Sequence, residues 1–162
     1  MRITSGLYKN RSLKSPNSDK THPMGDRERL ALFNMLGDVS GLTVLDLYAG
    51  TGALGIEAVS RGAKSATFVE KDRAACKIIK ENLGELNGEV LCADAEKFAP
   101  AQPFDIVFID PPYNIYNKDV VTQLARLGKL AVISMPKNGE LPDLKITKEH
   151  TYANCKIIIS ML

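Results

Sequence analysis

The feature that most constrains this chain is a glycine-rich turn between an apolar strand and a helix. The stretch 44–48 is apolar apart from one aspartate and predicts a strand, and Gly50-Thr51-Gly52 follows almost at once. Together with Gly55, these glycines have the spacing G-x-G-x-x-G, which lets the backbone turn tightly and present a helix N-terminus to a nucleotide-type ligand. The pattern predicts an α/β fold with a cofactor at this turn, and a tight turn without a ligand is the alternative.

Extended and helical segments alternate through the rest of the chain. Besides 44–48, we expect strands at 66–70, 90–92, 104–109, 130–135, 145–152 and 156–161, and helices at 53–61, 73–86 and 120–126. Such alternation produces right-handed crossovers and a mostly parallel sheet. The last two strands have no helix between them and should pair as an antiparallel hairpin. The expected fold is a Rossmann-like α/β domain with seven strands and helices on both faces.

The first 20 residues are basic and rich in turn formers, which predicts a small hairpin or arm ahead of a main domain at 21–162. Residues 1–29 contain seven cations against three anions, whereas the whole chain has a net charge of only +2. This asymmetry suggests a polyanionic partner, and a solvated flexible tail is the alternative. A helix capped by Asp26 and ended by Gly37 should follow.

The cysteines and the apolar runs indicate where such a chain works. Cys76, Cys92 and Cys155 are odd in number and form no CxxC pattern, which argues against a disulfide framework or a zinc site. The N-terminus has no apolar segment typical of a secretory signal, and the longest apolar runs are too short to span a bilayer. We therefore expect a cytoplasmic protein without a metal, and nothing requires more than a monomer.

Three acids lie near the carboxyl ends of successive predicted strands: Asp46, Glu70 and Asp94. In a parallel sheet these ends open onto one crevice. Carboxylates there suit the ammonium and sulfonium of S-adenosylmethionine, whereas they would repel the pyrophosphate of NAD. Glu70 could accept both ribose hydroxyls, and Asp94 could accept from the adenine amine. Each acid alone could instead cap a helix.

A carboxylate, two prolines and an aromatic ring follow the fourth predicted strand, in the order Asp110-Pro111-Pro112-Tyr113. The prolines fix φ and lack N–H donors, so the loop offers carbonyl and carboxylate acceptors. Such a surface suits a planar amino group, whose lone pair two hydrogen bonds can aim at a methyl group while Tyr113 stacks on the base. Positioning and electrostatics would then supply most of the rate. The alternative is a stiff loop in which Asp110 only caps the next segment.

These motifs resemble the class I S-adenosylmethionine-dependent methyltransferases that modify amino groups, whose [Asp/Asn]-Pro-Pro-[Tyr/Phe] signature matches 110–113. Along nearly its whole length the chain is similar to the RsmD-type 16S ribosomal RNA guanine-N2-methyltransferases. The basic opening up to Leu13, the helical segment 22–36 and the stretches LDLYAGTGALGIEA, FVEKD and FDIVFIDPPY match that family in order and spacing. The resemblance implies methylation of the N2 amine of a guanine in 16S ribosomal RNA, free or in a small-subunit assembly intermediate.

The resemblance also implies which residues form each part of the site. The residues expected to hold S-adenosylmethionine are Asp46, Tyr48, Gly50, Gly52, Glu70, Lys71, Asp94, Ala95 and Asp110. The residues expected to receive the guanine are Asp110, Pro111, Pro112 and Tyr113. The residues expected to contact RNA are Arg2, Lys9, Arg11 and Arg27, and the segment around Pro23 would close over the cofactor or face the RNA.

The chain departs from the family pattern in two places. His22 and Met24 stand where the family usually has Arg and Thr, and Ser134-Met135-Pro136 replaces a usually acidic ending. A DNA or RNA adenine-N6 methyltransferase would use the same acceptor motif, but 162 residues leave little length for a target-recognition region. A non-catalytic S-adenosylmethionine- or RNA-binding module would have no use for that motif. His150 and Tyr152 are expected at the surface, without a catalytic role.

Overall fold

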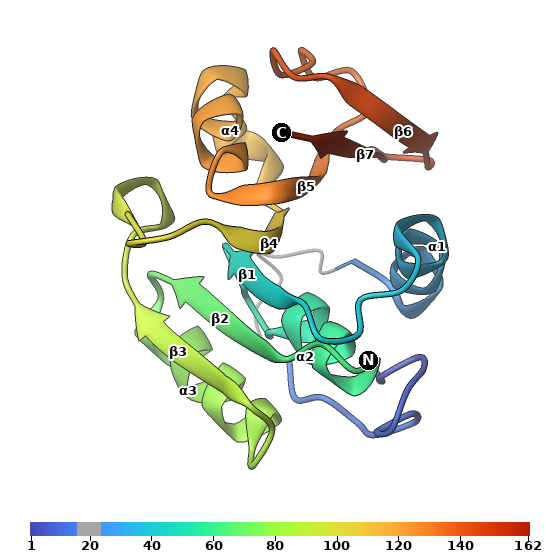
Figure 1. Ribbon diagram of the computed structural model, residues 1–162, viewed down its shortest axis with the longest axis vertical. Helices are drawn as coiled ribbons and strands as arrows, with labels where there is room; N and C mark the ends of the chain where they lie inside the picture. The colour runs from blue at the N-terminus through green and yellow to red at the C-terminus, as the bar shows by residue number, and fades with distance from the viewer. Residues whose placement is uncertain (16–23) are drawn as a thin grey trace.

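The computed structural model describes residues 1–15 and 24–162, and a seven-stranded sheet forms its centre (Figure 1). The strand order is β3-β2-β1-β4-β5-β7-β6. The strands are β1 (Thr43–Leu47), β2 (Ser65–Glu70), β3 (Gly88–Cys92), β4 (Phe104–Ile109), β5 (Gly128–Pro136), β6 (Ile146–Thr151) and β7 (Cys155–Met161). The first five in this order pair in parallel, and β7 is antiparallel to both neighbours. The prediction of a mostly parallel sheet with a terminal antiparallel hairpin is confirmed.

Helices cover both faces of the sheet. They are α1 (Asp26–Leu36), α2 (Ala53–Ser60), α3 (Arg73–Leu83) and α4 (Lys118–Ala125), with short 3-10 helices η1 (Ala95–Lys97) and η2 (Tyr113–Ile115). One core layer, around Phe68 and Phe108, lies beneath α1, α2 and α3, and the other, around Val107 and Ile133, lies beneath α4. Strand β4 contributes to both layers, which explains its nearly continuous apolar sequence. Within the described residues, no helix is both long and apolar enough to cross a membrane.

The N-terminal residues form a hairpin that packs against α2 (Figure 1, blue). The amide of Ile3 donates to the carbonyl of Arg11 at 3.0 Å, and the amide of Leu7 donates to the carbonyl of Ser60 at 2.7 Å. Gly6 has a φ of +84°, and a Cβ there would collide with the Ser60 carbonyl, so the turn requires glycine. The predicted hairpin is confirmed for residues 1–15, and the alternative of a solvated tail is wrong for them.

A buried ionic cluster joins the hairpin to α1 and α2. The Glu57 carboxylate accepts from Arg29 Nε at 3.3 Å, from Arg61 Nε at 3.0 Å and from the Thr4 amide at 2.8 Å. Arg29 is fully buried and also donates to the Asp26 carboxylate at 2.8 Å. Every charge in this cluster therefore has an opposite charge or a hydrogen-bond partner, as burial of ions requires.

Several helix boundaries differ from the prediction by one to three residues, and α4 begins at Lys118 rather than at residue 120. Gly25, not Asp26, occupies the N-cap of α1, because the Asp26 carboxylate accepts from the main-chain amide of Arg2 and from Arg29 instead. Helix α3 ends at Leu83, earlier than predicted, where Gly84 adopts a φ of +58°. The predicted division between residues 20 and 21, together with His22 and Pro23, lies outside the described residues.

The prediction that the cysteines form no disulfide was wrong. The structure joins Cys76 of α3 to Cys92 of β3 in a disulfide, with the Cα atoms 6.1 Å apart, and Cys155 is free. The two joined residues are 16 positions apart and belong to no spacing motif. Their meeting depends on the packing of α3 against β3, which the cysteine spacing does not reveal.

Candidate cofactor and acceptor site

The glycine turn follows β1 near the middle of the sheet. Tyr48, Gly50 and Gly52 all have positive φ, at 57°, 56° and 75°, which ends the strand at Leu47. A Cβ at Gly52 would meet the side chain of Ile79 at 3.0 Å, so this position requires glycine. A Cβ at Gly50 would meet only the Tyr48 carbonyl, at 3.9 Å. Gly50 therefore borders open space in which a ligand can approach the backbone.

Two predicted acids brace this turn. The Asp46 carboxylate accepts from the Gly55 amide at 2.9 Å, and Asp46 is only 2% exposed. The Glu70 carboxylate accepts from the amides of Gly50 and Asp72, both at 2.9 Å. The structure thus brings Asp46 and Glu70 together at the glycine turn and shows that both also hold its backbone in place.

Desolvated carboxyl groups give this edge of the sheet its electrostatic character. Burial raises the pKa of Asp46 to about 8, and the negative charges of Asp110 and Glu70 add to the effect. Burial of its carboxyl group also raises the pKa of Asp110. In the part of the chain that the structure describes, neither Asp46 nor Asp110 forms an ion pair. A cationic ligand would supply the missing charge, so this donor set fits the ammonium and sulfonium of S-adenosylmethionine.

The end of β3 extends the same edge. Asp94 caps η1 by accepting from the Glu96 amide at 3.0 Å, so the capping role considered as an alternative is present. Ala95 is buried, whereas Lys71 after β2 is exposed. Tyr48 Oη donates to the Glu96 carboxylate at 3.4 Å, which links the glycine turn to η1. Three strand ends therefore border one continuous edge.

The acceptor loop, Asp110–Tyr113, leaves the sheet beside the glycine turn, because β4 pairs in parallel with β1 and their last residues are opposite one another. Pro111 is buried, Pro112 is exposed, and Tyr113 is 41% exposed. An accessible ring next to a carboxylate can stack on a planar base while the acid accepts from its amino group. The structure therefore brings the predicted acceptor residues next to the predicted cofactor turn.

Two side chains that the sequence analysis did not assign complete the surroundings of this loop. Ser134 Oγ of β5 lies 3.1 Å from the Tyr113 hydroxyl, and Ser134 also lowers the pKa of the Asp110 carboxyl beside it. Cys155 at the start of β7 lies near the same Tyr113 hydroxyl and contributes to the raised pKa of Tyr113, after the larger effect of burial. Ser134 and Cys155 reach the loop through the pairing of β5 with β4 and β7. The departure at Ser134 was the only hint in the sequence.

The residues near the end of the chain are only partly as predicted. His150 is exposed, and its ring centroid lies 4.6 Å from that of Tyr152. Tyr152 is half-buried, and within the described residues its buried hydroxyl has no hydrogen-bond partner. Burial raises the pKa of Tyr152, and the neighbouring Cys155 and Glu28 add to the effect.

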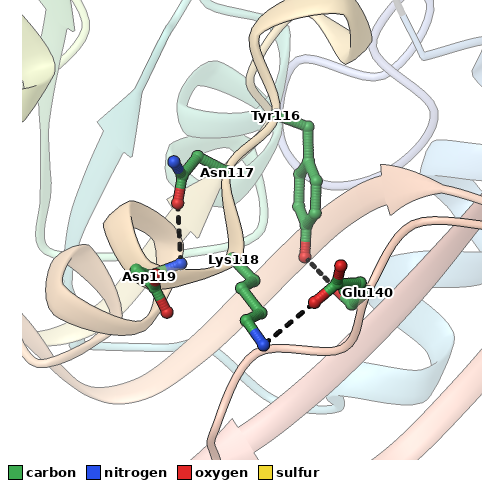
Figure 2. A pocket seen from close by; sticks show the side chains of 5 residues that line it. All are labelled: Tyr116, Asn117, Lys118, Asp119 and Glu140. Atoms are coloured by element: carbon green, nitrogen blue, oxygen red, sulfur yellow. Dashed lines mark hydrogen bonds and ion pairs between the residues drawn. The ribbon is translucent and has the colours of Figure 1, made fainter.

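A hollow of about 360 Å³ opens just beyond the acceptor loop (Figure 2). Its lining residues are Tyr116, Asn117, Lys118, Asp119 and Glu140. Lys118 Nζ pairs with the Glu140 carboxylate at 2.9 Å, and Tyr116 Oη donates to the Glu140 carbonyl at 2.7 Å. These contacts tie the chain after the acceptor loop to the connection between β5 and β6. The hollow contains none of the predicted site residues and is therefore separate from the cofactor edge.

The four predicted RNA contacts lie on the hairpin and α1. Arg2, Lys9 and Arg27 are exposed, whereas Arg11 is half-buried and donates to a carbonyl of α3 at 2.7 Å. The main-chain amide of Arg2 donates to the Asp26 carboxylate at 3.2 Å, which brings Arg2 close to the first turn of α1 and Arg27. Lys9 lies in the turn of the hairpin. The structure thus brings Arg2 close to the helix turn that contains Arg27, whereas Lys9 belongs to the hairpin turn.

Comparisons with known proteins identify relatives along the whole chain. The family model described as "Conserved hypothetical protein 95" matches residues 1–159. YlbH of Bacillus subtilis, provisionally named an rRNA methyltransferase, is 36% identical over 172 residues, which cover 94% of each protein. Ribosomal RNA small subunit methyltransferase D of Escherichia coli is 41% identical over 119 residues, which cover 70% of this chain and only 60% of that protein.

The fold also has a counterpart among solved structures. The structure of yhhF from Escherichia coli, provisionally named a methyltransferase, superposes with a TM-score of 0.84 at 30% identity. The alignment covers 99% of this chain and 97% of that one. Together with the strand order, this similarity confirms the predicted Rossmann-like class I methyltransferase fold.

Proposed function

This chain belongs to the RsmD-type family, whose family model covers residues 1–159, and from that membership we propose that it methylates the N2 amine of a guanine in small-subunit ribosomal RNA. One observation carries the proposal. The acceptor loop leaves the sheet next to the glycine turn, where the carboxyls of Asp46 and Asp110 are desolvated and, among the described residues, lack an ion-pair partner. A cationic methyl donor and an amino group would satisfy these acids together.

We assign S-adenosylmethionine to the glycine turn and the neighbouring strand ends. When bound, it supplies a methyl group on a positively charged sulfur. Asp46 provides a negative charge for its cationic part, Glu70 accepts from the ribose hydroxyls, and Asp94 accepts from the adenine amine. Gly50 leaves room for the ligand beside the backbone. The proposed contacts are completed by Tyr48, Gly52, Lys71, Ala95 and Asp110.

The acceptor loop positions the base. The Asp110 carboxylate and the Pro111 carbonyl accept from the two N–H groups of the guanine amine, which turns the nitrogen lone pair toward the methyl group. Pro112 stiffens the loop and Tyr113 stacks on the ring. The methylated nitrogen then carries a positive charge until it loses one proton. The Asp110 carboxylate can take up that proton, since burial raises its pKa.

The hairpin and α1 provide the RNA-binding surface in this proposal. Arg2, Lys9, Arg11 and Arg27 contact phosphates, and a hollow of about 340 Å³ lies between Tyr8 and Arg11 of the hairpin and the segment 84–86 after α3. Because the hairpin is fixed to α2, its cations form a rigid surface. Four phosphate contacts to single-stranded RNA predict that log affinity falls with log salt at a slope of roughly −3. A flat salt response would exclude the hairpin from RNA binding.

The test is methyl transfer from labelled S-adenosylmethionine to ribosomal RNA and to small subunits from cells that lack the enzyme, followed by nucleoside analysis. We expect labelled N2-methylguanosine with the wild type and with Asp119→Ala, an exposed control, and none with Asp110→Ala. N6-methyladenosine would reassign the protein as an adenine methyltransferase. Cofactor binding without transfer to any RNA would indicate a non-catalytic module.

A further inference from the structure

A buried serine joins the two functional groups of the acceptor loop. Ser134 is 4% exposed and directly follows Ile133, which pairs with Ile109 across β5 and β4. Ser134 therefore stands beside Asp110, the next residue along the neighbouring strand. Its hydroxyl lies 3.1 Å from the Tyr113 hydroxyl, and it lowers the pKa of the neighbouring Asp110 carboxyl. One side chain thus acts on both groups that the base would meet.

The chemistry of the donors fixes the direction of these hydrogen bonds. An ionised carboxylate can only accept, so the Ser134 hydroxyl must donate to Asp110. A hydroxyl has a single proton, so the Tyr113 hydroxyl must then donate to the Ser134 oxygen. Cys155 of β7 lies near the same Tyr113 hydroxyl and affects its pKa. The result is an ordered chain of two hydroxyls that runs from the Tyr113 ring through Ser134 of β5 to the Asp110 carboxylate.

We propose that Ser134 is a positioning residue for the acceptor base. Ser134 holds one oxygen of Asp110 and the edge of the Tyr113 ring, so that the second Asp110 oxygen and the face of the ring meet the amine. The identity of the base rests on the proposed function, whereas the ordered hydrogen bonds do not. The bond from Ser134 also opposes the effect of burial on the pKa of Asp110 and so favours its ionised form. An ionised Asp110 is the form that accepts from an amine.

The titratable groups around these hydrogen-bonded hydroxyls make Ser134 more important for keeping Asp110 ionised. They are Asp46 from β1, Glu28 from α1, Tyr152 from the turn before β7 and Cys155 from β7. None of them is a cation, so none offsets the charge of Asp110. Across residues 1–15 and 24–162, the hydrogen bond from Ser134 is the one interaction identified that lowers the pKa of Asp110.

The decisive comparison is Ser134→Ala against Ser134→Thr and Ser160→Ala. Ser160 is also a fully buried strand serine, but its hydroxyl donates to the Lys145 carbonyl at 2.9 Å, remote from the acceptor loop. For Ser134→Ala we expect an approximately 10-fold lower single-turnover rate and little change in the KM for RNA. The acid limb of the pH–rate profile, which reports the ionisation of Asp110, should move to higher pH by about one unit. Threonine should restore both properties. Equal rates and profiles for Ser134→Ala and Ser160→Ala would overturn the inference.

A second readout needs no RNA. In protein labelled with ¹³C at its aspartate carboxyls, the Asp110 signal is assigned by its loss in Asp110→Asn and followed through a pH titration. We expect this carboxyl to titrate at higher pH in Ser134→Ala than in the wild type or Ser160→Ala. An unchanged titration would refute the positioning role. Failure of the wild type to methylate RNA would count against the proposed function alone, and the titration would then decide the inference by itself.

Discussion

At the interface of the hairpin with α2, the buried Glu57 carboxylate lies between Arg29 and Arg61, whereas at the carboxyl edge of the sheet the buried Asp46 faces two further acids. Both carboxylates are buried away from solvent. In the first region the protein supplies the compensating charges itself. In the second, no cation from the described residues pairs with Asp46 or with Asp110.

The consequences appear in the protonation of these groups. Hydrogen bonds from Thr4, Arg61 and Arg29 outweigh burial and lower the pKa of Glu57, while burial raises the pKa of Asp46 to about 8. The hairpin interface is therefore electrostatically complete, and changes there should act on stability. The carboxyl edge is incomplete without a cation, and changes there should act on binding and catalysis.

Removal of the acceptor carboxylate should give the largest effect and should leave the fold intact. For Asp110→Ala we expect at least about a 10³-fold loss of single-turnover rate, because the amine loses its charged acceptor. The melting temperature at pH 8 should not fall, since a desolvated acid next to Asp46 is removed. Rapid-quench methyl transfer and thermal unfolding test both statements. A variant with more than a tenth of the wild-type rate would exclude Asp110 from the chemistry.

A change in the hairpin interface should have the opposite pattern. Glu57→Ala leaves Arg29 buried without its carboxylate and should lower the free energy of unfolding by about 3–5 kcal/mol. Urea denaturation measures this loss. Glu149→Ala is the control, because Glu149 is exposed and lies 4.0 Å from Lys156, a pair that should contribute at most about 0.5 kcal/mol. Similar losses for the two variants would show that the buried cluster does not stabilise the hairpin.

The pH dependence of Asp46→Asn tests the incomplete edge directly. Below its ordinary pKa of 3.8, Asp46 is protonated in the folded and unfolded states alike. Between that pH and about 8 the unfolded chain releases the proton and the folded protein keeps it, so rising pH favours unfolding. We expect Asp46→Asn to match the wild type near pH 4 and to be more stable by about 2 kcal/mol at pH 9, in unliganded protein. Parallel stability curves would contradict the raised pKa.

The fold was predictable because its local signals are strong. Strand β4 was predicted with its observed bounds, since a strand covered on both faces is apolar throughout. Gly37 and Gly52 adopt positive φ where the sequence predicted a helix end and a glycine turn. The acids Asp46 and Glu70 were predicted at one crevice from their positions at strand ends alone. Their hydrogen bonds to the turn were not, because these depend on side-chain geometry.

What the sequence could not reveal depends on contacts between distant elements. Ser134 and Cys155 meet Tyr113 only because β5 lies between β4 and β7. Cys76 meets Cys92 only because α3 packs on β3. Residue spacing along one element carries no information about such meetings, so the neighbours of Tyr113 on β5 and β7 emerged only from the structure.

The smallest expected effect comes from the other end of β4, where Asp105 is paired as Glu57 is. Its carboxylate accepts from Lys129 Nζ at 2.7 Å and from the Thr43 amide at 2.9 Å, and these contacts lower its pKa to about 2. The stabilisation is present above the ordinary pKa of 3.8 and is lost as pH falls toward 2. For Asp105→Asn we expect a loss of only about 1 kcal/mol at pH 7, because Lys129 is exposed to solvent and its charge is screened.

This loss should shrink toward zero near pH 2 and should weaken in 1 M salt. Urea denaturation across pH gives the difference from the wild type for Asp105→Asn and for Asp46→Asn. The two differences should have opposite signs, a loss for the paired acid and a gain for the unpaired one. Asp105 and Asp46 lie in neighbouring strands of one sheet. If the two stability differences had the same sign, burial or strand position, and not the presence of a counter-charge, would determine how each acid affects stability.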